Sequence, residues 1–579
     1  MAVTQPDPSP SAFLDQTESR LLSLAIESSQ ADWVYATYIT DDSEALSSKA
    51  LARLLQATAE CAKRTVKFPR SALTPTEGRK VDLLRLSLPL PAPSDPKEAE
   101  ELTALVASMT GAYSKGRYTP KGRSESLDLI QLGQILRESR DPAVLKDVWT
   151  GWHRVGREVF RGFPRYVELA NRGARELGFQ DTGDLWRSKY DMSAEAFQQE
   201  VERLWEQVRP LYRELHAFVR RKLSERYGPD VVPPRGPIPA HLLGNMWAQS
   251  WEYLLPVLLP AGAGPSFDLT SILKTRKVDP VGMVKFAERF FVSLGLPPLP
   301  ETFWTRSLFS RPQDREVVCH ASAWDLDFVD DLRIKMCIET TGEEFRVIHH
   351  ELGHNYYQRA YAHQPFLFRD GAHDGFHEAI GDTIALSVTP EYLRKVGLLE
   401  NVPGPEEDLG LLLASALEKV AFLPFGLLID QWRWQVFDGR VGVRDYNRAW
   451  WSLREKYQGV APPEPRGPEE FDPGAKFHVP ANTPYMRYFL AHILQFQFHR
   501  AFAKTIGWTG PLHRASIYES KEVGARLRAM LEMGQSEPWP EALMAATGER
   551  RMDGSALLEY YRPLEAWLRK ENAGAPVGW

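Results

Sequence analysis

The stretch RVIHHELGHNYY, residues 346–357, places two histidines one helical turn apart with a glutamate directly after the first. Thr341 and Glu344 precede it with the spacing of a capping box, which predicts that a helix starts there. The apolar residues that follow recur on one helical face: Phe345, Ile348, Leu352 and Tyr356. We therefore expect a helix that runs to about Tyr361.

On such a helix His350 and His354 project in the same direction, as two imidazole ligands of a tetrahedral Zn²⁺ must. Glu351 lies between them in sequence and would face a water molecule held by the metal. In this motif the carboxylate is the general base, and the metal lowers the pKa of the water toward 7. The five-residue pattern also arises by chance, so a third ligand is needed to support it.

The segment DGFHEAIGDTIALSV, residues 374–388, supplies that ligand. Asp374 can cap a second helix on which Glu378 and Asp382 lie four residues apart on one face. Glu378 would be the third zinc ligand, and Asp382 would accept the free N–H of a zinc-bound imidazole. The alternative is an ordinary surface helix with scattered histidines. Six of the 14 histidines fall between residues 349 and 377, which argues against an even scatter.

Four of those histidines have no such pairing, and we expect structural or solvent-facing roles for them: His349, His363, His373 and His377. Gly381 stands in the middle of the second predicted helix, where it costs about 1 kcal/mol relative to alanine. A glycine at that position indicates close contact between helices beside the metal.

The composition is that of a folded globular protein, with 43% hydrophobic and 25% charged residues and a formal net charge of -6 over 579 residues. It is too acidic to suggest nucleic acid as a partner. The most apolar stretch, LGLLLASALEKVAFLPFGLLI, contains Glu418, Lys419 and Pro424, so we expect no membrane span. Residues 1–15 lack the basic and apolar segments of a signal peptide.

Long stretches with a helical period dominate the chain, and few segments have the alternation of strands. Short proline-rich breaks that contain apolar residues indicate turns between packed helices. We therefore predict a mostly α-helical fold, with a disordered tail over residues 1–15 and a single large unit over 16–579. No repeat of fixed period is visible.

Cys319 and Cys337 flank a segment whose second half alternates polar and apolar residues, which is typical of a hairpin. A disulfide closing this hairpin and a pair of unpaired core thiols are both compatible with the sequence. A bridge would favour export into an oxidising compartment, with the leader absent from this chain, although a cytoplasmic location stays open. Cys61 lies in a helical pattern and is expected to be a buried free thiol.

At this point the sequence resembles the angiotensin-converting enzyme, or peptidyl-dipeptidase A, family of zinc metallopeptidases. The first 120 or so residues match only loosely, but the rest carries the family's motifs in order: WRSKY (186–190), GPIPAHLLGNMWAQSW (236–251), CHASAWD (319–325), HHELGH (349–354), GFHEAIGD (375–382), DQWRWQVFDG (430–439), WWSLREKYQG (450–459), FDPGAKFHVP (471–480) and PYMRYF (484–489). The resemblance implies a helical ellipsoid of two subdomains around a deep central cleft, with a small β-hairpin at the active site.

The resemblance also implies the chemistry of the site. It assigns zinc binding to His350, His354 and Glu378, and activation of the water to Glu351. Tyr488 and His478 would donate hydrogen bonds to the oxyanion of the tetrahedral intermediate. Such preorganised donors are typically worth about 3 to 4 kcal/mol each.

Members of this family remove dipeptides from the free C-terminus of oligopeptides. The residues that read the terminal carboxylate match Gln249, Lys476 and Tyr485, and a related branch that removes single residues has arginine at the glutamine position. The resemblance further assigns substrate contacts to these residues: His320 and Ala321 for the peptide backbone, and Phe422 and Phe425 for the last side chain. A plain core role for the two phenylalanines is equally compatible.

Three departures from the family pattern affect specificity and anion binding. His492 replaces a pocket phenylalanine, and Leu129 replaces a glutamate that some members place beyond the scissile bond. For chloride, Tyr190 and Arg487 match one site, and Trp450 and Arg454 match part of a second. His153 replaces the arginine of that second site. We therefore expect one good chloride site and a weak or absent second one.

Two rival functions share parts of this pattern. One is a zinc oligopeptidase of the same superfamily, which cuts inside short peptides and lacks the carboxylate-reading trio. The other is a catalytically silent peptide-binding protein with the same fold. The presence of Glu351, Tyr488 and His478 argues against a silent protein, because loss of the base is the simplest route to silence. The oligomeric state and the physiological peptide are not predicted.

Overall fold

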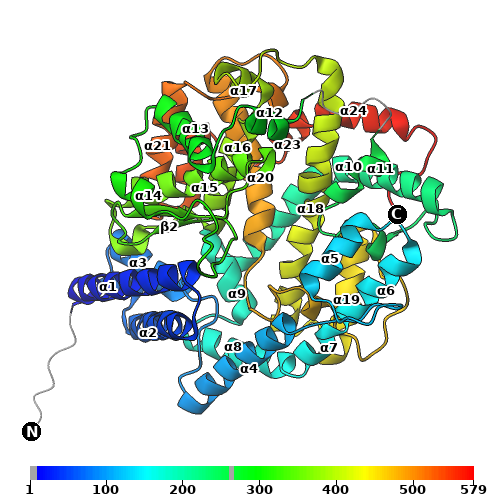
Figure 1. Ribbon diagram of the computed structural model, residues 1–579. Coiled ribbons are helices and arrows are strands. Elements are labelled where there is room, and N and C mark those ends of the chain that lie inside the picture. The colour runs from blue at the N-terminus through cyan, green and yellow to red at the C-terminus, as the bar shows by residue number, and fades with distance from the viewer. Residues whose placement is uncertain (1–8, 260–266) are drawn as a thin grey trace, which may run out of the picture.

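The computed structural model describes residues 9–259 and 267–579, and it is built almost entirely of α-helices (Figure 1). Two pairs of short strands are its only sheets among the described residues. The mostly α-helical prediction is therefore confirmed. The division into two subdomains around a cleft stays a prediction.

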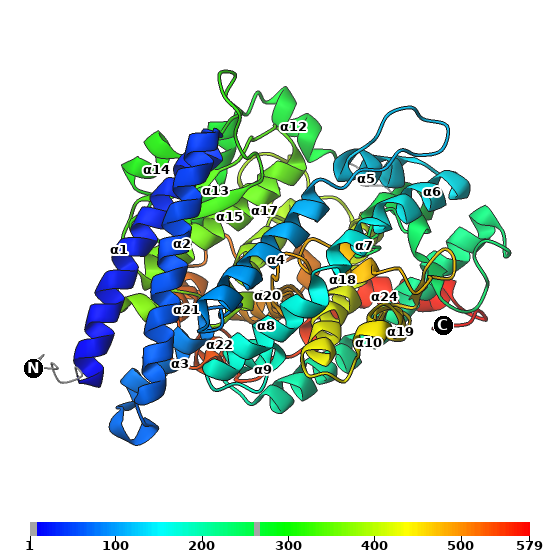
Figure 2. The ribbon, with the colours of Figure 1, turned by 90° about the horizontal axis from the view of Figure 1, so that it is seen from below.

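The chain before the β2–β3 hairpin, at residues 322–335, forms a first series of α-helices. They are α1 (Pro10–Thr37), α2 (Asp41–Arg64), α3 (Pro75–Leu86), α4 (Pro96–Ser114), α5 (Leu129–Glu138), α6 (Pro142–His153), α7 (Val155–Phe160), α8 (Phe163–Glu176), α9 (Thr182–Arg187), α10 (Ala194–Tyr227), α11 (Leu255–Leu258), α12 (Leu269–Thr275), α13 (Pro280–Ser293) and α14 (Glu301–Arg306). In both views α1 and α2 lie side by side at one edge of the molecule (Figures 1 and 2).

The second half forms the helices that carry most of the predicted site residues. They are α15 (Gly342–Tyr361), α16 (Asp374–Leu386), α17 (Pro390–Lys395), α18 (Asp408–Phe437), α19 (Tyr446–Leu453), α20 (Met486–Thr505), α21 (Lys521–Leu531), α22 (Trp539–Thr547), α23 (Ser555–Tyr560) and α24 (Arg562–Glu571). The strands are β1 (Ile238–Pro239), which pairs in parallel with β4 (Val460–Ala461), and β2 (Ser322–Asp325), which pairs antiparallel with β3 (Leu332–Lys335).

Helix α18 runs through the middle of the molecule, between the α15–α16 region and α10 (Figure 1). By length and composition, the segment Pro405–Phe437 is the one described helix that could cross a membrane, yet 78% of its most apolar window is buried in the protein. A helix that is apolar on all sides is stable in water only when other elements surround it. We therefore interpret α18 as the central core helix.

The predicted N-terminal tail is too long. Helix α1 already begins at Pro10, and the Ser9 hydroxyl accepts a hydrogen bond from the Ala12 N–H at 3.3 Å. Serine at the N-cap followed by proline in the first turn is a strong start signal, which the prediction overlooked. Residues 10–15 are thus helical, and residues 1–8 lie outside the described part.

The predicted hairpin and its disulfide are both present. Ser322 at the start of β2 lies opposite Lys335 at the end of β3, and the Cys319–Cys337 bridge closes the hairpin just outside this pair. The buried Lys335 ammonium donates hydrogen bonds to the carbonyl oxygens of Val318 and His320, at 2.7 Å each. The chain before β2 is therefore held by both a covalent bond and a buried cation. Cys61 is buried and free, as predicted.

The two motif helices start close to where the sequence predicts. The Thr341 hydroxyl accepts the Glu344 N–H at 3.1 Å, but the Thr341 N–H bonds to the Glu339 carbonyl, so only half of the capping box forms. The cap of α16 is His373, whose Nδ1 accepts the Gly375 N–H at 3.0 Å. Asp374 is the first helical residue instead of the cap, because its carboxylate bonds to Tyr190.

Helices α15 and α16 touch backbone to backbone, as Gly381 predicts. A Cβ atom placed on Gly353 would lie 2.9 Å from the Gly381 Cα, and one placed on Gly381 would lie 2.8 Å from the His350 Nδ1. Such distances are shorter than van der Waals contact allows. Only glycine at both positions lets the two helices approach closely enough to share ligands for one ion.

The disulfide supplies a stability prediction. Because Cys319 and Cys337 are separated by 18 residues, replacing both by serine should lower the free energy of unfolding by about 3 kcal/mol. Calorimetry of the parent and the double variant, with and without a thiol reductant, measures the effect. The reductant should lower the melting temperature of the parent and of a Cys61→Ser control, but leave that of the double variant unchanged. Equal melting temperatures for the parent and the double variant would contradict the prediction.

Candidate functional site

Three predicted metal ligands converge between α15 and α16. The donor atoms of His350, His354 and Glu378 all lie within 4.8 Å of one another. The His350 Nε2 is 3.0 Å from the His354 Nε2 and 3.6 Å from the Glu378 Oε2. Two imidazoles and one carboxylate that leave a position open are the donor set of a catalytic zinc site. Among the described residues, this is the group that could hold a metal ion.

Asp382 contacts the first of these histidines, and its role in orienting that ring stays a prediction. Its Oδ1 lies 3.2 Å from the His350 Nδ1, which places a proton on that nitrogen and would leave the Nε2 lone pair to a bound metal. The other carboxylate oxygen accepts a hydrogen bond from Gln495 at 3.0 Å and lies 3.7 Å from the Lys419 ammonium. Burial raises the pKa of Asp382, but Lys419 and His350 outweigh it and hold the pKa well below its usual range.

His377 contacts His354, the second predicted ligand, and the sequence analysis missed this contact. Its Nδ1 lies 3.2 Å from the His354 Nδ1, and its Nε2 lies 3.3 Å from the Tyr361 hydroxyl. Burial lowers the pKa of His377, which keeps the ring neutral and able to accept the His354 N–H. No spacing rule links two histidines on different helices, so the pairing could not be found without the tertiary structure.

Glu351 is buried, 7% exposed, on the helix that carries both histidine ligands. Burial raises the pKa of its carboxyl group, and the charge of Glu378 adds to that effect, while His350 and His320 oppose it. The net pKa lies above its usual value. A carboxylate with a raised pKa is a stronger base, as the predicted role requires.

The predicted carboxylate-reading trio also comes together. The Lys476 ammonium donates a hydrogen bond to the Gln249 Oε1 at 2.6 Å and lies 5.5 Å from the centre of the Tyr485 ring. It also lies over the Trp247 ring, 4.1 Å from its centre. Burial lowers the pKa of Lys476 to about 7, and no opposing charge of the described residues offsets that effect. This group is well suited to receive an anion.

His478 and Tyr488 lie beside that trio. The His478 ring is centred 4.7 Å from the Tyr485 ring and 5.9 Å from the Tyr488 ring. Burial, helped by the charges of Lys476 and Arg433, lowers the pKa of His478 to about 2, so the ring is neutral. Burial raises the pKa of Tyr488, which keeps its hydroxyl protonated and able to donate.

A buried ion pair on α18 holds the loop that carries these groups. Asp430 and Arg433 pair at 2.5 Å with side chains only 2% and 1% exposed. The Asp430 Oδ2 accepts the N–H groups of Tyr485 and Met486 at 2.8 and 2.7 Å, and Arg433 donates to the His478 carbonyl at 3.0 Å. The DQWRWQVFDG motif thus has a structural task, which the sequence analysis did not assign.

The predicted pocket for the terminal side chain is aromatic. Phe422 stacks on His492 with ring centres 4.6 Å apart and lies 5.9 Å from the Tyr485 ring. The His492 Nδ1–H donates to the Tyr488 carbonyl at 2.8 Å, which leaves its Nε2 as an acceptor. Phe425 is fully buried and lies 5.8 Å from the Lys476 ammonium. Phe422 and Phe425 therefore lie next to the carboxylate-reading group.

The predicted backbone contacts lie before the hairpin. His320 is exposed, Ala321 is half-buried, and the His320 Nδ1 lies 2.9 Å from the Ala321 carbonyl oxygen. Asn355 of α15 donates hydrogen bonds to the carbonyls of Trp324 and Arg333, at 3.2 Å each, and so fixes the hairpin to the metal-site helix.

The residues predicted to bind chloride fall into two different environments. Tyr190 and Arg487 both contact the carboxylate of Asp374. Arg454, in contrast, is 2% exposed, and its guanidinium carbon lies 5.8 Å from the centre of the Trp450 ring. Its Nη1 donates to a backbone carbonyl, and its Nε has no hydrogen-bond partner among the described residues.

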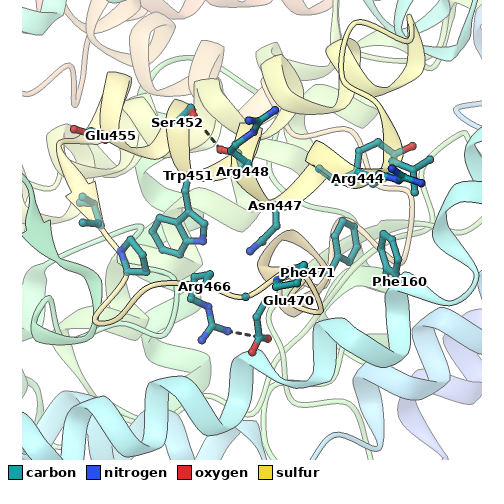
Figure 3. A pocket seen from close by; sticks show the side chains of 17 residues that line it. Phe160, Arg444, Asn447, Arg448, Trp451, Ser452, Glu455, Arg466, Glu470 and Phe471 are labelled. Carbon is teal, nitrogen blue, oxygen red and sulfur yellow. Dashed lines mark hydrogen bonds and ion pairs between the residues drawn. The ribbon is translucent and has the colours of Figure 1, made fainter.

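A surface pocket of about 740 Å³ lies elsewhere (Figure 3). Its lining includes Phe160, Trp451 and Phe471, together with Arg466, whose guanidinium pairs with Glu470 at 3.0 Å. None of the predicted site residues lines it. The pocket is therefore separate from the metal cluster.

Comparison with known proteins agrees with the geometry. A family model for angiotensin-converting enzyme, peptidase family M2, matches residues 6–579. Angiotensin-converting enzyme of Bos taurus is 43% identical over 585 residues, covering 98% of this chain and 44% of that protein, and that of Theromyzon tessulatum is 42% identical, covering 95% and 90%. The chain thus spans less than half the length of the angiotensin-converting enzymes of Bos taurus and Sus scrofa. It belongs to the angiotensin-converting enzyme family of peptidases.

Proposed function

We propose that this chain is a zinc-dependent peptidyl-dipeptidase that hydrolyses the penultimate peptide bond and releases dipeptides from oligopeptides with a free C-terminus. The proposal rests on two groups of residues that lie next to each other, since α16 packs against α20 and the charge of Glu378 acts on the Tyr488 hydroxyl. One is the ligand cluster of α15 and α16, and the other is the loop around residues 476–488, which bears both the oxyanion donors and the carboxylate-reading lysine.

The ligand cluster fits zinc by its donor set and by the fixed tautomer of His350. When bound, zinc would polarise the scissile carbonyl and lower the pKa of a water molecule. Glu351 takes the proton from that water as it attacks, and later gives a proton to the leaving amine. The raised pKa of Glu351 suits both transfers.

Tyr488 and His478 donate hydrogen bonds to the oxygen on which negative charge develops. Both are neutral near pH 7, so each offers a proton without the cost of burying a charge. Their distance from each other is set by the loop that the Asp430–Arg433 pair holds. The donors are thus in place before the substrate arrives.

The terminal carboxylate binds to Lys476, with Gln249 and Tyr485 as directed donors. A carboxylate beside the buried ammonium raises the pKa of Lys476 and completes its charge balance. A peptide amide at the same place leaves the ammonium uncompensated, and this mismatch favours free C-termini. Leu129 lies at the start of α5, and we propose no acidic recognition beyond the scissile bond.

We also infer that chloride binds beside Arg454 and Trp450. Burial lowers the pKa of Arg454 to about 9, as expected of a guanidinium without a carboxylate partner. His153, which replaces the second arginine of the family pattern, has its pKa lowered by burial to about 4 and adds no charge. A single guanidinium would bind an anion weakly.

The disulfide between Cys319 and Cys337 favours an oxidising compartment, so we propose that the protein is exported. Its partners are then extracytoplasmic oligopeptides with free carboxylates. Among the described residues, α18 is the helix that is long and apolar enough to span a membrane. Because it is mostly buried in the protein, we interpret it as a core helix and not as a membrane anchor.

The substrate class can be tested with a pair of matched peptides. The purified protein with one zinc per chain should release the C-terminal dipeptide from an N-blocked tripeptide with a free carboxylate, but should cleave the C-terminal amide at least a hundredfold more slowly. Mass spectrometry identifies the products, and chelation of the metal serves as the blank. Equal cleavage of both peptides would favour an oligopeptidase, and no cleavage with zinc bound would favour a silent binding protein.

The base can be tested by substitution. Glu351→Ala should retain one zinc per chain, because the carboxylate is not a ligand, and should lose at least about a thousandfold in kcat. Atomic absorption measures the metal, and steady-state kinetics measure the turnover. Glu343→Ala, at an exposed position in the first turn of the same helix, is the control and should retain activity. Near-normal turnover of Glu351→Ala would remove the proposed base.

Substitutions of Tyr488 and Tyr485 should affect different kinetic constants. Tyr488→Phe removes an oxyanion donor and should lower kcat by about 10² to 10³ with little change in KM. Tyr485→Phe removes a donor to the terminal carboxylate and should mainly raise KM for the free-acid peptide. Kinetics on both variants with the same tripeptide measure this split. The same pattern in both variants would mean that the assigned roles are wrong.

A further inference from the structure

We propose that Asp374 is a built-in anion that holds Arg487 and thereby positions Tyr488, in place of the chloride that the sequence predicts between Tyr190 and Arg487. This inference rests on the proposed function, because Tyr488 is the proposed oxyanion donor. It makes Asp374 a positioning residue, since the carboxylate acts through Arg487.

The carboxylate of Asp374 bridges the two groups that were expected to share an ion. Its Oδ1 accepts a hydrogen bond from the Tyr190 hydroxyl at 2.9 Å, and its Oδ2 lies 3.5 Å from the Arg487 Nε. The side chains of Asp374 and Arg487 are 16% and 28% exposed. A phenol hydroxyl and a guanidinium on either side of one negative charge form a small anion site, and here the protein itself supplies the anion.

Close packing fixes the three residues relative to one another. A Cβ atom placed on Gly375 would lie 3.2 Å from the Arg487 carbonyl oxygen, so the first turn of α16 rests directly on the backbone of α20. The Tyr190 ring stacks on Phe197 with centres 3.9 Å apart and an angle of 4° between planes. The carboxylate therefore reaches both partners without rearrangement of the backbone.

The charge on Asp374 is well supported. Burial raises the pKa of its carboxyl group, but Arg487, Lys189, His373 and the Tyr190 hydrogen bond outweigh that effect, and the net pKa lies below its usual value. Asp374 is also the first residue of α16, where the helix dipole favours a negative charge. The side chain is thus an anion throughout the neutral pH range.

The contact joins α16, which carries one proposed zinc ligand, to α20, which carries one proposed oxyanion donor. Arg487 directly precedes Tyr488 on α20, and Asp374 lies one turn before the proposed zinc ligand Glu378 on α16. Without the carboxylate, Arg487 would stay largely buried beside Tyr488 and would lose its ion-pair partner, and Asp370, the other carboxylate that acts on it, has a smaller effect. A free small anion could then take the vacant space, whereas in the parent a covalently attached carboxylate at contact distance excludes it.

The experiment is rescue of Asp374→Ala by small anions. At constant ionic strength, the variant without added anion should have kcat lowered at least tenfold with less than threefold change in KM, and formate or chloride should restore most of the loss in a saturable manner. The double variant Asp374→Ala/Arg487→Leu should not be restored. Asp41→Ala removes an exposed aspartate from the first position of α2 and should behave as the parent.

Anion binding can also be measured as a rise in the melting temperature, and this measurement does not depend on enzymatic activity. Formate should stabilise Asp374→Ala more than the parent, and the difference should disappear in the double variant, whose Arg454 site is unchanged. If a folded, zinc-loaded Asp374→Ala keeps full kcat, or if formate fails to stabilise it beyond the parent, the inference is overturned. A parent without peptidase activity would instead overturn the proposed function, and the thermal measurement would still decide the anion site.

Discussion

The site depends on one contact, the approach of α15 and α16 at Gly353 and Gly381. Because neither glycine has a Cβ atom, the two helix axes come close enough for the His350 Nε2 and the Glu378 Oε2 to lie 3.6 Å apart. The ligand set, the base on α15 and the residues behind the ligands all follow from that approach. It is a steric constraint, and no hydrogen bond or charge could replace it.

A second constraint joins the metal cluster to the residues that read the substrate. The buried Asp430–Arg433 pair satisfies the N–H groups at the start of α20 and a carbonyl of the loop before it. The same loop delivers Lys476 to Gln249. Breaking a buried ion pair by removal of one partner costs about 3 to 5 kcal/mol, so this loop is rigid and its donors are preorganised. The Asp430–Arg433 pair links α18 to α20, and the Asp374–Arg487 contact links α16 to α20.

Predictions from local spacing held where the interaction is itself local. The helix around His350 starts and ends where the capping and periodicity signals indicate. The contact of His350 with Asp382 is not local, and it was predicted from the combination of the two metal-site motifs. The predicted N-cap of α16 was wrong by one residue. Local rules assign the cap to Asp374, but its carboxylate accepts a hydrogen bond from Tyr190, and His373 caps the helix instead. The predicted N-terminal tail was too long, because the prediction overlooked Ser9 as an N-cap and Pro10 as the first helical residue.

Residue types and their spacing were enough to predict the helical class and the hairpin with its cysteines, which the structure confirms, and to propose the metal ligands and the base, since each depends on chemistry carried within short segments. The resemblance to a family added the loop residues, whose separation in sequence hides their proximity. What required the folded chain were contacts between distant segments: His377 behind His354, and a carboxylate filling an expected ion site. Such contacts depend on how helices pack, and a one-dimensional pattern carries no record of which distant side chains meet.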